Sequence, residues 1–154
     1  MSKSLTRVTN ALQTAGLTVT IHAFTEPTRT AAEAALAAGC TLNQIVKSIL
    51  FQGQSGQLYL FLTAGGNQVD PGRAALLTAE LLHRAEADAV RRITGFAIGG
   101  VSPIGHLTAL PVWCDPTLMA FDTVWAAAGT PNHIFRITPP DLLTLTRATV
   151  APFT

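Results

Sequence analysis

The chain has 154 residues, of which 48% are hydrophobic and 12% are charged, and its formal net charge is +1 at pH 7. These values indicate one globular domain, residues 1–154, and exclude a disordered chain. The low net charge also excludes a protein that binds along an extended nucleic-acid backbone. No apolar run reaches the roughly 18 residues of a membrane span, and the N-terminal residues lack a signal peptide's apolar segment. We therefore expect a cytoplasmic protein with no membrane partner.

The residue types that most often bind metals or form disulfides are sparse. Cys40 and Cys114 are too few and too far apart for a disulfide framework or a zinc site, and they favour two buried, reduced thiols. The four histidines show no metal-ligating spacing, so neither a metal nor another cofactor is expected. The arginines leave two interpretations open, contacts to a few phosphates or a solvated surface: Arg7, Arg29, Arg73, Arg84, Arg91 and Arg92.

The first part of the chain predicts a helix, a strand and a second helix. Apolar residues over 4–15 recur at helical spacing, and residues 18–24 alternate as in a strand. Thr30 is a suitable cap for an alanine-rich helix over 31–38, which Gly39 closes.

The middle of the chain predicts a hairpin followed by short helices. Residues 45–51 and 58–63 have the composition of strands, and the glycines within 53–56 favour a hairpin connection between them. Residues 71–87 are expected to form two short helices, the second of which begins near Thr78.

The last part adds strands over 110–114, 123–127 and 134–137, and a helix that starts at Pro139 with Thr138 as its cap. Hairpins and helices are mixed rather than repeated as strand–helix units. The predicted fold class is therefore α+β, with a mixed, largely antiparallel central sheet or open barrel flanked by helices.

Lys47 is one of two lysines and lies inside an apolar strand. Because alternate residues of a strand share a face, Lys47 shares one with Ile45, Ile49 and Phe51. An ammonium group on such a face costs free energy unless it is hydrated, paired or shifted in pKa. Either this face opens into a polar pocket, or Lys47 guards an edge strand with its stem buried.

Residues 99–105, Gly-Gly-Val-Ser-Pro-Ile-Gly, form a second informative segment. Glycines allow close approach of a ligand to the backbone, and successive N–H groups can bind an anion or a developing oxyanion. The alternative is an ordinary tight connection between strands. No Walker or dinucleotide-binding spacing is present.

The remaining polar residues carry weaker signals. His133 opens a strand directly after a turn, which places it where a pocket can lie. Ser48 and Ser102 have no recognisable base partner, so a serine hydrolase is not indicated. Asp115 is expected at a turn, as a cap.

Three segments in order resemble one protein family: residues 39–51 (GCTLNQIVKSILF), 95–105 (GFAIGGVSPIG), and 110–118 with 126–142 (LPVWCDPTL and AAAGTPNHIFRITPPDL). They resemble the YbaK/prolyl-tRNA-synthetase-associated domain family of aminoacyl-tRNA deacylases, over about residues 8–150. The lysine strand and the Gly-x-x-x-Pro loop are the hallmarks of that family.

The resemblance implies a mixed α/β fold with a barrel-like sheet, and trans-editing as the activity. Such an enzyme hydrolyses the ester between a wrong amino acid and the 3′ adenosine of a tRNA, typically tRNA-Pro, so the partners are the acceptor end and prolyl-tRNA synthetase. The protein supplies positioning and oxyanion stabilisation, while the tRNA 2′-hydroxyl, a water or a substrate thiol assists. A small pocket admits small side chains, so alanine, serine, threonine, cysteine and 2-aminobutyrate all remain possible. Alanine is favoured because the residues of the cysteine-clearing branch are absent.

The resemblance also assigns site residues. Lys47, Gly99 and Pro103 are the expected catalytic residues, with Lys47 at the terminal phosphate or ribose and the loop backbone at the ester carbonyl. The expected substrate-binding residues are Phe24, Gly100, Ser102, Gly129 and His133.

The sequence departs from relatives at two places. Phe24 replaces a tyrosine found in some relatives, and the segment from Gly129 to Ile134 lacks the Arg-Gly and the later aspartate of the cysteine-clearing branch. Two alternatives to the deacylase remain: a non-catalytic tRNA- or nucleotide-binding module of the same fold, and a hydrolase of small esters or thioesters.

Overall fold

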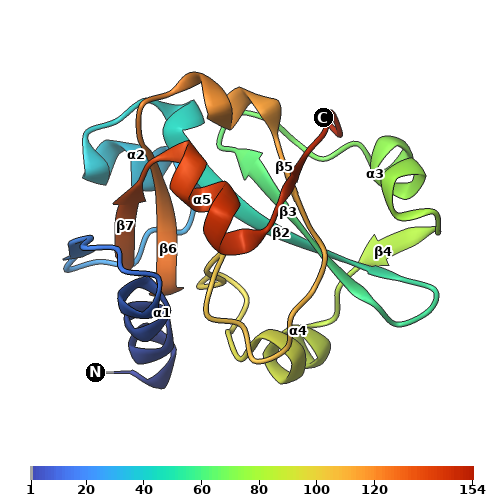
Figure 1. Ribbon diagram of the computed structural model, residues 1–154, viewed down its shortest axis with the longest axis horizontal. Helices are drawn as coiled ribbons and strands as arrows, with labels where there is room; N and C mark the ends of the chain where they lie inside the picture. The colour runs from blue at the N-terminus through green and yellow to red at the C-terminus, as the bar shows by residue number, and fades with distance from the viewer. Residues whose placement is uncertain (1) are drawn as a thin grey trace.

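The computed structural model describes residues 2–154, and an eight-stranded sheet forms its centre (Figure 1). The strands are β1 (Ile21–Ala23), β2 (Ile45–Gly53), β3 (Leu58–Ala64), β4 (Leu82–Arg84), β5 (Val112–Cys114), β6 (Val124–Thr130), β7 (His133–Ile137) and β8 (Thr149–Val150). The α-helices are α1 (Lys3–Thr14), α2 (Ala31–Ala38), α3 (Pro71–Thr78), α4 (Ala87–Thr94) and α5 (Pro139–Thr146). Two short 3₁₀ helices are η1 (Leu42–Gln44) and η2 (Pro116–Ala120).

The strand order is β1-β7-β6-β2-β3-β5-β8, and β4 also pairs with β2. The antiparallel pairs are β1–β7, β2–β3, β2–β4 and β6–β7, whereas β2–β6, β3–β5 and β5–β8 are parallel. The expected mixed, largely antiparallel sheet is therefore confirmed. In Figure 1 the β2–β3 hairpin extends toward the side of the molecule that carries β4 and α3.

Local capping chemistry explains the helices that were predicted correctly. Thr30 accepts a hydrogen bond from the Glu33 amide at the start of α2, and Gly39 ends that helix in the left-handed conformation. Thr138 accepts from the Asp141 amide at the start of α5, with Pro139 as the first helical residue. Both helices begin at a threonine cap, and α2 also ends at a glycine, whereas α5 ends at Arg147 in the left-handed conformation.

Two predictions about elements need correction. The strand expected over 18–24 is paired only at β1, Ile21–Ala23. The helix expected from Thr78 is wrong, because Ala79 turns the chain with a φ of 60° and residues 82–84 then pair with β2 as strand β4. Glu80 is held at this turn by accepting hydrogen bonds from the Ser55 amide and hydroxyl at the β2–β3 connection. The second helix, α4, begins only at Ala87.

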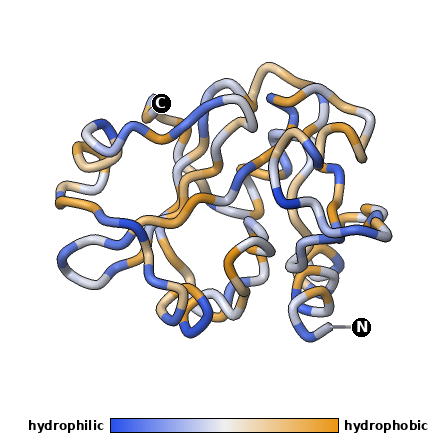
Figure 2. Tube along the Cα trace, turned by 180° about the vertical axis from the view of Figure 1, so that it is seen from behind, coloured by the Kyte–Doolittle hydropathy of each residue, from blue (hydrophilic) through white to orange (hydrophobic). Residues whose placement is uncertain are grey.

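The core lies on both faces of the central strands. Every residue of β3 is buried, and Figure 2 shows hydrophobic stretches along the central strands. The larger cluster joins α1, α5 and the sheet and includes Leu12, Leu62, Phe135 and Leu142. Because burial of apolar area drives folding, this two-sided packing makes β3 the centre of the core.

An aromatic cluster fills the opposite face of β3. The ring of Phe61, which is fully buried, stacks on Trp113 at 5.4 Å between centroids and meets the edge of Phe153 at 5.0 Å. Such aromatic pairs add to the stability that area burial alone gives.

Substitution Phe61→Ala is expected to lower the free energy of unfolding by about 3–5 kcal/mol, because it leaves a cavity among these rings. Leu76→Ala is the matched control, since Leu76 is 84% exposed and its loss should change stability by about 0.5 kcal/mol or less. Urea unfolding followed by circular dichroism measures both. Equal, small effects would contradict the packing described for Phe61.

Candidate active site

A cavity of about 470 Å³ occupies a gap in the sheet. Strand β2 is paired with β6 only at Ile45 and Val46, and with β4 only over Phe51–Gly53. Between these two regions the edge of β2 has no neighbouring strand. The cavity is lined there by residues 45–50 of β2, by Arg84 at the end of β4 with Ala85 after it, and by 125–127 of β6.

The walls of the cavity are mainly apolar, and its charged residues are all cationic. The apolar residues include Ile49, Val90, Ile98 and Trp125. The charged residues in the lining are Arg29, Lys47 and Arg84. A cavity of this kind attracts an anion at its rim and accepts an apolar group inside. Arg29 and Arg84 therefore form part of the candidate site, whereas the alternative for these arginines was a solvated surface without a binding role.

Lys47 is held in the cavity wall by a polar network. Its Nζ donates a hydrogen bond to the Asn67 carbonyl, and the Asn67 side-chain amide donates to Asp115 Oδ2 at 2.9 Å. The neighbours of Lys47 on its strand face are Ile45 and Ile49, which belong to apolar clusters distinct from the main core. Lys47 thus lines a pocket, and the alternative of an edge-strand guard does not apply, because β2 lies inside the sheet between β3 and β6.

Opposing effects act on the pKa of each charged group in this network, Lys47 and Asp115. Burial lowers the pKa of Lys47, and the negative charge of Asp115 opposes that shift. Burial alone would raise the pKa of Asp115, but hydrogen bonds from Asn67, Thr117 and Ala64 outweigh it and lower that pKa. Asp115, only 1% exposed, is therefore a buried carboxylate that is linked to Lys47 through Asn67.

The glycine loop contributes Gly99 and Val101 to the cavity lining. Gly99 lines the cavity with a φ of +94°, and the space around its Cα is open. A Cβ on Gly100 would lie 3.0 Å from Thr130 Cα, so this glycine permits close packing of the loop on β6. Ser102 and Pro103 are buried, and the Ser102 carbonyl lies 2.6 Å from His106 Nε2.

Arg7 of helix α1 anchors both ends of the segment 95–105, which contains this loop. Its guanidinium donates to the Gly95 carbonyl at 2.6 Å and to the Gly105 carbonyl at 3.2 Å. The same group lies over the Phe96 ring, 4.9 Å from the centroid. Bidentate contacts of this kind restrict geometry strongly. Arg7 therefore has a structural role in place of the phosphate contact or solvated position that the sequence left open.

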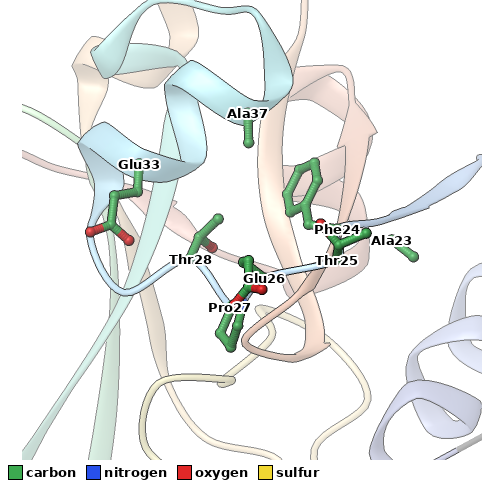
Figure 3. Close-up of a pocket in the computed structure, with 8 residues that line it drawn as sticks. All are labelled: Ala23, Phe24, Thr25, Glu26, Pro27, Thr28, Glu33 and Ala37. Atoms are coloured by element: carbon green, nitrogen blue, oxygen red, sulfur yellow. The ribbon is translucent and has the colours of Figure 1, made fainter.

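Phe24 lies in a different hollow, of about 520 Å³ (Figure 3). In Figure 3 its ring points toward α2, which carries Glu33 and Ala37. Thr28 lines both hollows, so they are neighbours. Glu33 is already engaged, because its carboxylate accepts a hydrogen bond from the Arg29 amide at 2.8 Å.

Gly129 and His133 lie at the β6–β7 turn, outside the lining of both hollows. Gly129 is buried with a φ of +98°, and a Cβ there would lie 2.9 Å from the Ser4 carbonyl. His133 Nδ1 lies 2.5 Å from the Thr130 hydroxyl. The structure thus brings Lys47 and Gly99 to one cavity. The other expected residues are outside its lining: Phe24, Gly100, Ser102, Pro103, Gly129 and His133.

Sequence reasoning missed three parts of the site. Asn67 carried no motif, and Asp115 was expected only as a cap, which it also is, accepting from the Thr117 amide at 2.9 Å. Ser48 was noted without a role, yet it lines the cavity. The role of Asn67 and Asp115 depends on a contact between residues that are 48 positions apart, so no local sequence pattern could reveal it.

Other chemistries find little support in the part of the chain that the structure describes. Residues 2–154 contain no group of three or more histidine, cysteine or acidic side chains able to hold a metal ion. Both cysteines are free; Cys114 is buried and Cys40 is half-buried. Burial, with the nearby Asp115 charge, raises the pKa of Cys114 to about 12, which leaves it a poor nucleophile. No helix within 2–154 is long and apolar enough to cross a membrane.

Asp115→Asn is expected to lower stability at neutral pH by about 1–3 kcal/mol, because an amide replaces an acceptor of three hydrogen bonds. The lowered pKa of Asp115 means that its stabilisation is present above the unfolded-state pKa and is lost as pH falls through the folded-state pKa. The variant should therefore lose less stability than the parent on acidification. Urea unfolding at neutral and acidic pH checks this, with the exposed Asp122→Asn as control. Parallel pH profiles of parent and D115N would contradict the assignment.

Comparison with known proteins identifies the relatives of this chain. The profile of the aminoacyl-tRNA editing domain family matches residues 25–145. The uncharacterized protein YwhH of Bacillus subtilis is 31% identical over 119 residues, which cover 77% of this chain and 76% of YwhH.

Two further matches connect the chain with proline charging. A crystal structure described as a candidate trans-editing enzyme for prolyl tRNA synthetase superposes with a TM-score of 0.94 and 47% identity, covering 100% of this chain and 98% of the other. A proline–tRNA ligase of Bacillus licheniformis is 28% identical over 113 residues, which are 73% of this chain but only 20% of the ligase.

Proposed function

The chain belongs to the family of aminoacyl-tRNA editing domains, and we propose that it hydrolyses mischarged aminoacyl-tRNA in trans. In this reaction water cleaves the ester at the 3′ end and yields a free amino acid and a tRNA with its terminal hydroxyl restored. The proposed substrate is tRNA-Pro carrying a small non-cognate amino acid, alanine being favoured. The descriptions of the structural neighbour and of the ligase support the choice of tRNA-Pro and of prolyl-tRNA synthetase as a partner.

The observation that carries the proposal is that Lys47 and Gly99 line one cavity whose charged residues are all cationic. Arg29 and Arg84, both exposed, suit the phosphates of an acceptor end, while Lys47 suits the terminal phosphate or ribose as a point charge. The contact is small, in agreement with the net charge of +1. A small contact is sufficient when only the end of a tRNA enters.

An aminoacyl ester is already activated, so the protein need not supply a nucleophile. The tRNA 2′-hydroxyl or a positioned water can attack or assist, and the protein then holds the ester in place and stabilises the developing oxyanion. Gly99 allows close approach of the substrate to the loop backbone. The anchoring of the loop by Arg7 supports the rigidity that this task needs.

The apolar walls support a sieve for side-chain size. Rigid residues such as Trp125, Ile134 and Val101 bound the cavity and are all buried. A packed wall resists the entry of a larger side chain, because displacement of core atoms costs free energy. The ring of the cognate proline is then too large to enter the cavity, so prolyl-tRNA-Pro is not hydrolysed. The alanine side chain is small enough to enter.

Lys47→Met is expected to lower kcat/KM for alanyl-tRNA-Pro at least 100-fold and to keep the fold, because it removes a charge and preserves the apolar stem. Lys3→Met is the matched control, since Lys3 is an exposed lysine on α1. The assay is deacylation of Ala-, Ser-, Thr-, Cys- and Pro-tRNA-Pro, with circular dichroism as the folding check. An active K47M variant would refute the site, and hydrolysis of none of the substrates by the parent would favour the non-catalytic binding module.

Gly99→Ala is expected to reduce kcat/KM at least tenfold, because the new methyl group projects where the substrate must approach the loop. It should cost about 1–2 kcal/mol of stability, since φ is positive there. Gly56→Ala is the matched control: Gly56 has a φ of +90° and open space around it, but lies in the β2–β3 turn away from the cavity. Loss of activity in both variants would show a general effect of strain instead of a local one.

A further inference from the structure

Hydrogen bonds of β3 establish which way the backbone of β2 faces. The Leu60 amide donates to the Pro111 carbonyl at 3.0 Å, and the Leu62 carbonyl accepts from the Asp115 amide at 2.9 Å, both on the side away from β2. In an antiparallel pair, residues directly opposite either exchange hydrogen bonds or both turn away. Ser48 lies opposite Leu62, so the Ser48 N–H and C=O turn away from β3 and toward the gap.

In the gap, Ser48 meets no strand. The pairing of β2 with β6 ends at Val46, and the pairing with β4 begins at Phe51. The Ser48 side chain also carries an unsatisfied polar atom, because its Oγ is buried and lacks a hydrogen-bond partner among residues 2–154. Ser48 also lines the cavity. Polar groups in such a place are costly unless a ligand or water satisfies them, so Ser48 marks a binding position.

We propose that Ser48 binds the aminoacyl group of the substrate as if it were one residue of an added strand. The α-amine of the amino acid donates to the Ser48 carbonyl, and its ester carbonyl accepts from the Ser48 N–H. An amino acid presents these two groups at the spacing of a strand residue, which is the pattern exchanged in antiparallel pairing. This inference rests on the proposed deacylase function and names the group that the site recognises.

The surrounding charges are compatible with this arrangement. The cavity holds the cations Arg29, Lys47 and Arg84, which disfavour a second positive charge. An α-amino group titrates close to neutral pH, so it is able to bind as a neutral amine that still has two N–H donors. The Ser48 N–H then faces the carbonyl oxygen on which negative charge develops during attack.

The arrangement also determines where the side chain of the amino acid lies. Opposite residues of an antiparallel pair place their side chains on the same face. The side chain of an L-amino acid would therefore lie beside that of Ser48, on the face of Val46 and Leu50, where Val90 and Val101 also line the cavity. A D-amino acid would place its side chain on the Lys47 face. The site is thus expected to select the L-configuration and a small side chain together.

The first test varies the substrate and leaves the protein unchanged. The same tRNA is acylated with L-alanine, with D-alanine and with propionate, which is alanine without its amine. Each enzymatic kcat/KM is divided by the spontaneous hydrolysis rate of that ester. We expect at least a tenfold preference for L-alanyl over both other esters. Propionyl and D-alanyl esters hydrolysed within twofold of L-alanyl would overturn the inference while the deacylase function stands; no hydrolysis of any acyl-tRNA would overturn both.

The second test varies Ser48 with a matched pair of variants. Ser48→Val adds bulk beside the predicted position of the substrate side chain, whereas Ser48→Ala removes only the unpartnered hydroxyl. With Ser48→Val, kcat/KM for 2-aminobutyryl-tRNA should fall at least fivefold more than for alanyl-tRNA. With Ser48→Ala, the ratio of the two should stay within twofold of the parent, and the L-alanyl preference should persist because the backbone carries it. An unchanged ratio in a folded Ser48→Val variant would overturn the inference.

Discussion

The interrupted pairing of strand β2 is the constraint on which the rest of the site depends. A sheet that was paired along all of β2 would have no cavity, because β6 or β4 would cover residues 47–50. The gap leaves backbone hydrogen-bonding groups at a place that water or a ligand must reach. The long pairing of β2 with β3 keeps that edge rigid while it is open.

The two faces of β2 present different polar groups to the site. Lys47 points to one face, where Asn67 and Asp115 hold its charge in place. Ser48 lies on the other face, which it shares with Val46 and Leu50 of the main core. Because neighbouring residues of a strand alternate between faces, two adjacent positions present a cation and an uncharged polar group to the same cavity from opposite sides.

Much of the fold was predictable from the sequence because its signals are local. Helices α2 and α5 carry their own caps, and the β2–β3 hairpin carries its glycines. The strand β4 was missed because its residues become a strand only by pairing with β2, a contact across about 30 residues of chain. At the site, Lys47 was conspicuous as a charge in an apolar run. Ser48 was not, since its importance depends on a missing neighbour, which no single segment encodes.

The anchoring of the glycine loop by Arg7 has a consequence for how the domain is delimited. The match to the editing family spans residues 25–145, which contains Lys47 and the loop but not helix α1. A fragment cut to that span would keep Lys47 and Gly99 and lose the guanidinium that ties Gly95 to Gly105. The support of the candidate site therefore extends beyond the segment by which the family is recognised, to helix α1, whose Arg7 holds the loop in place.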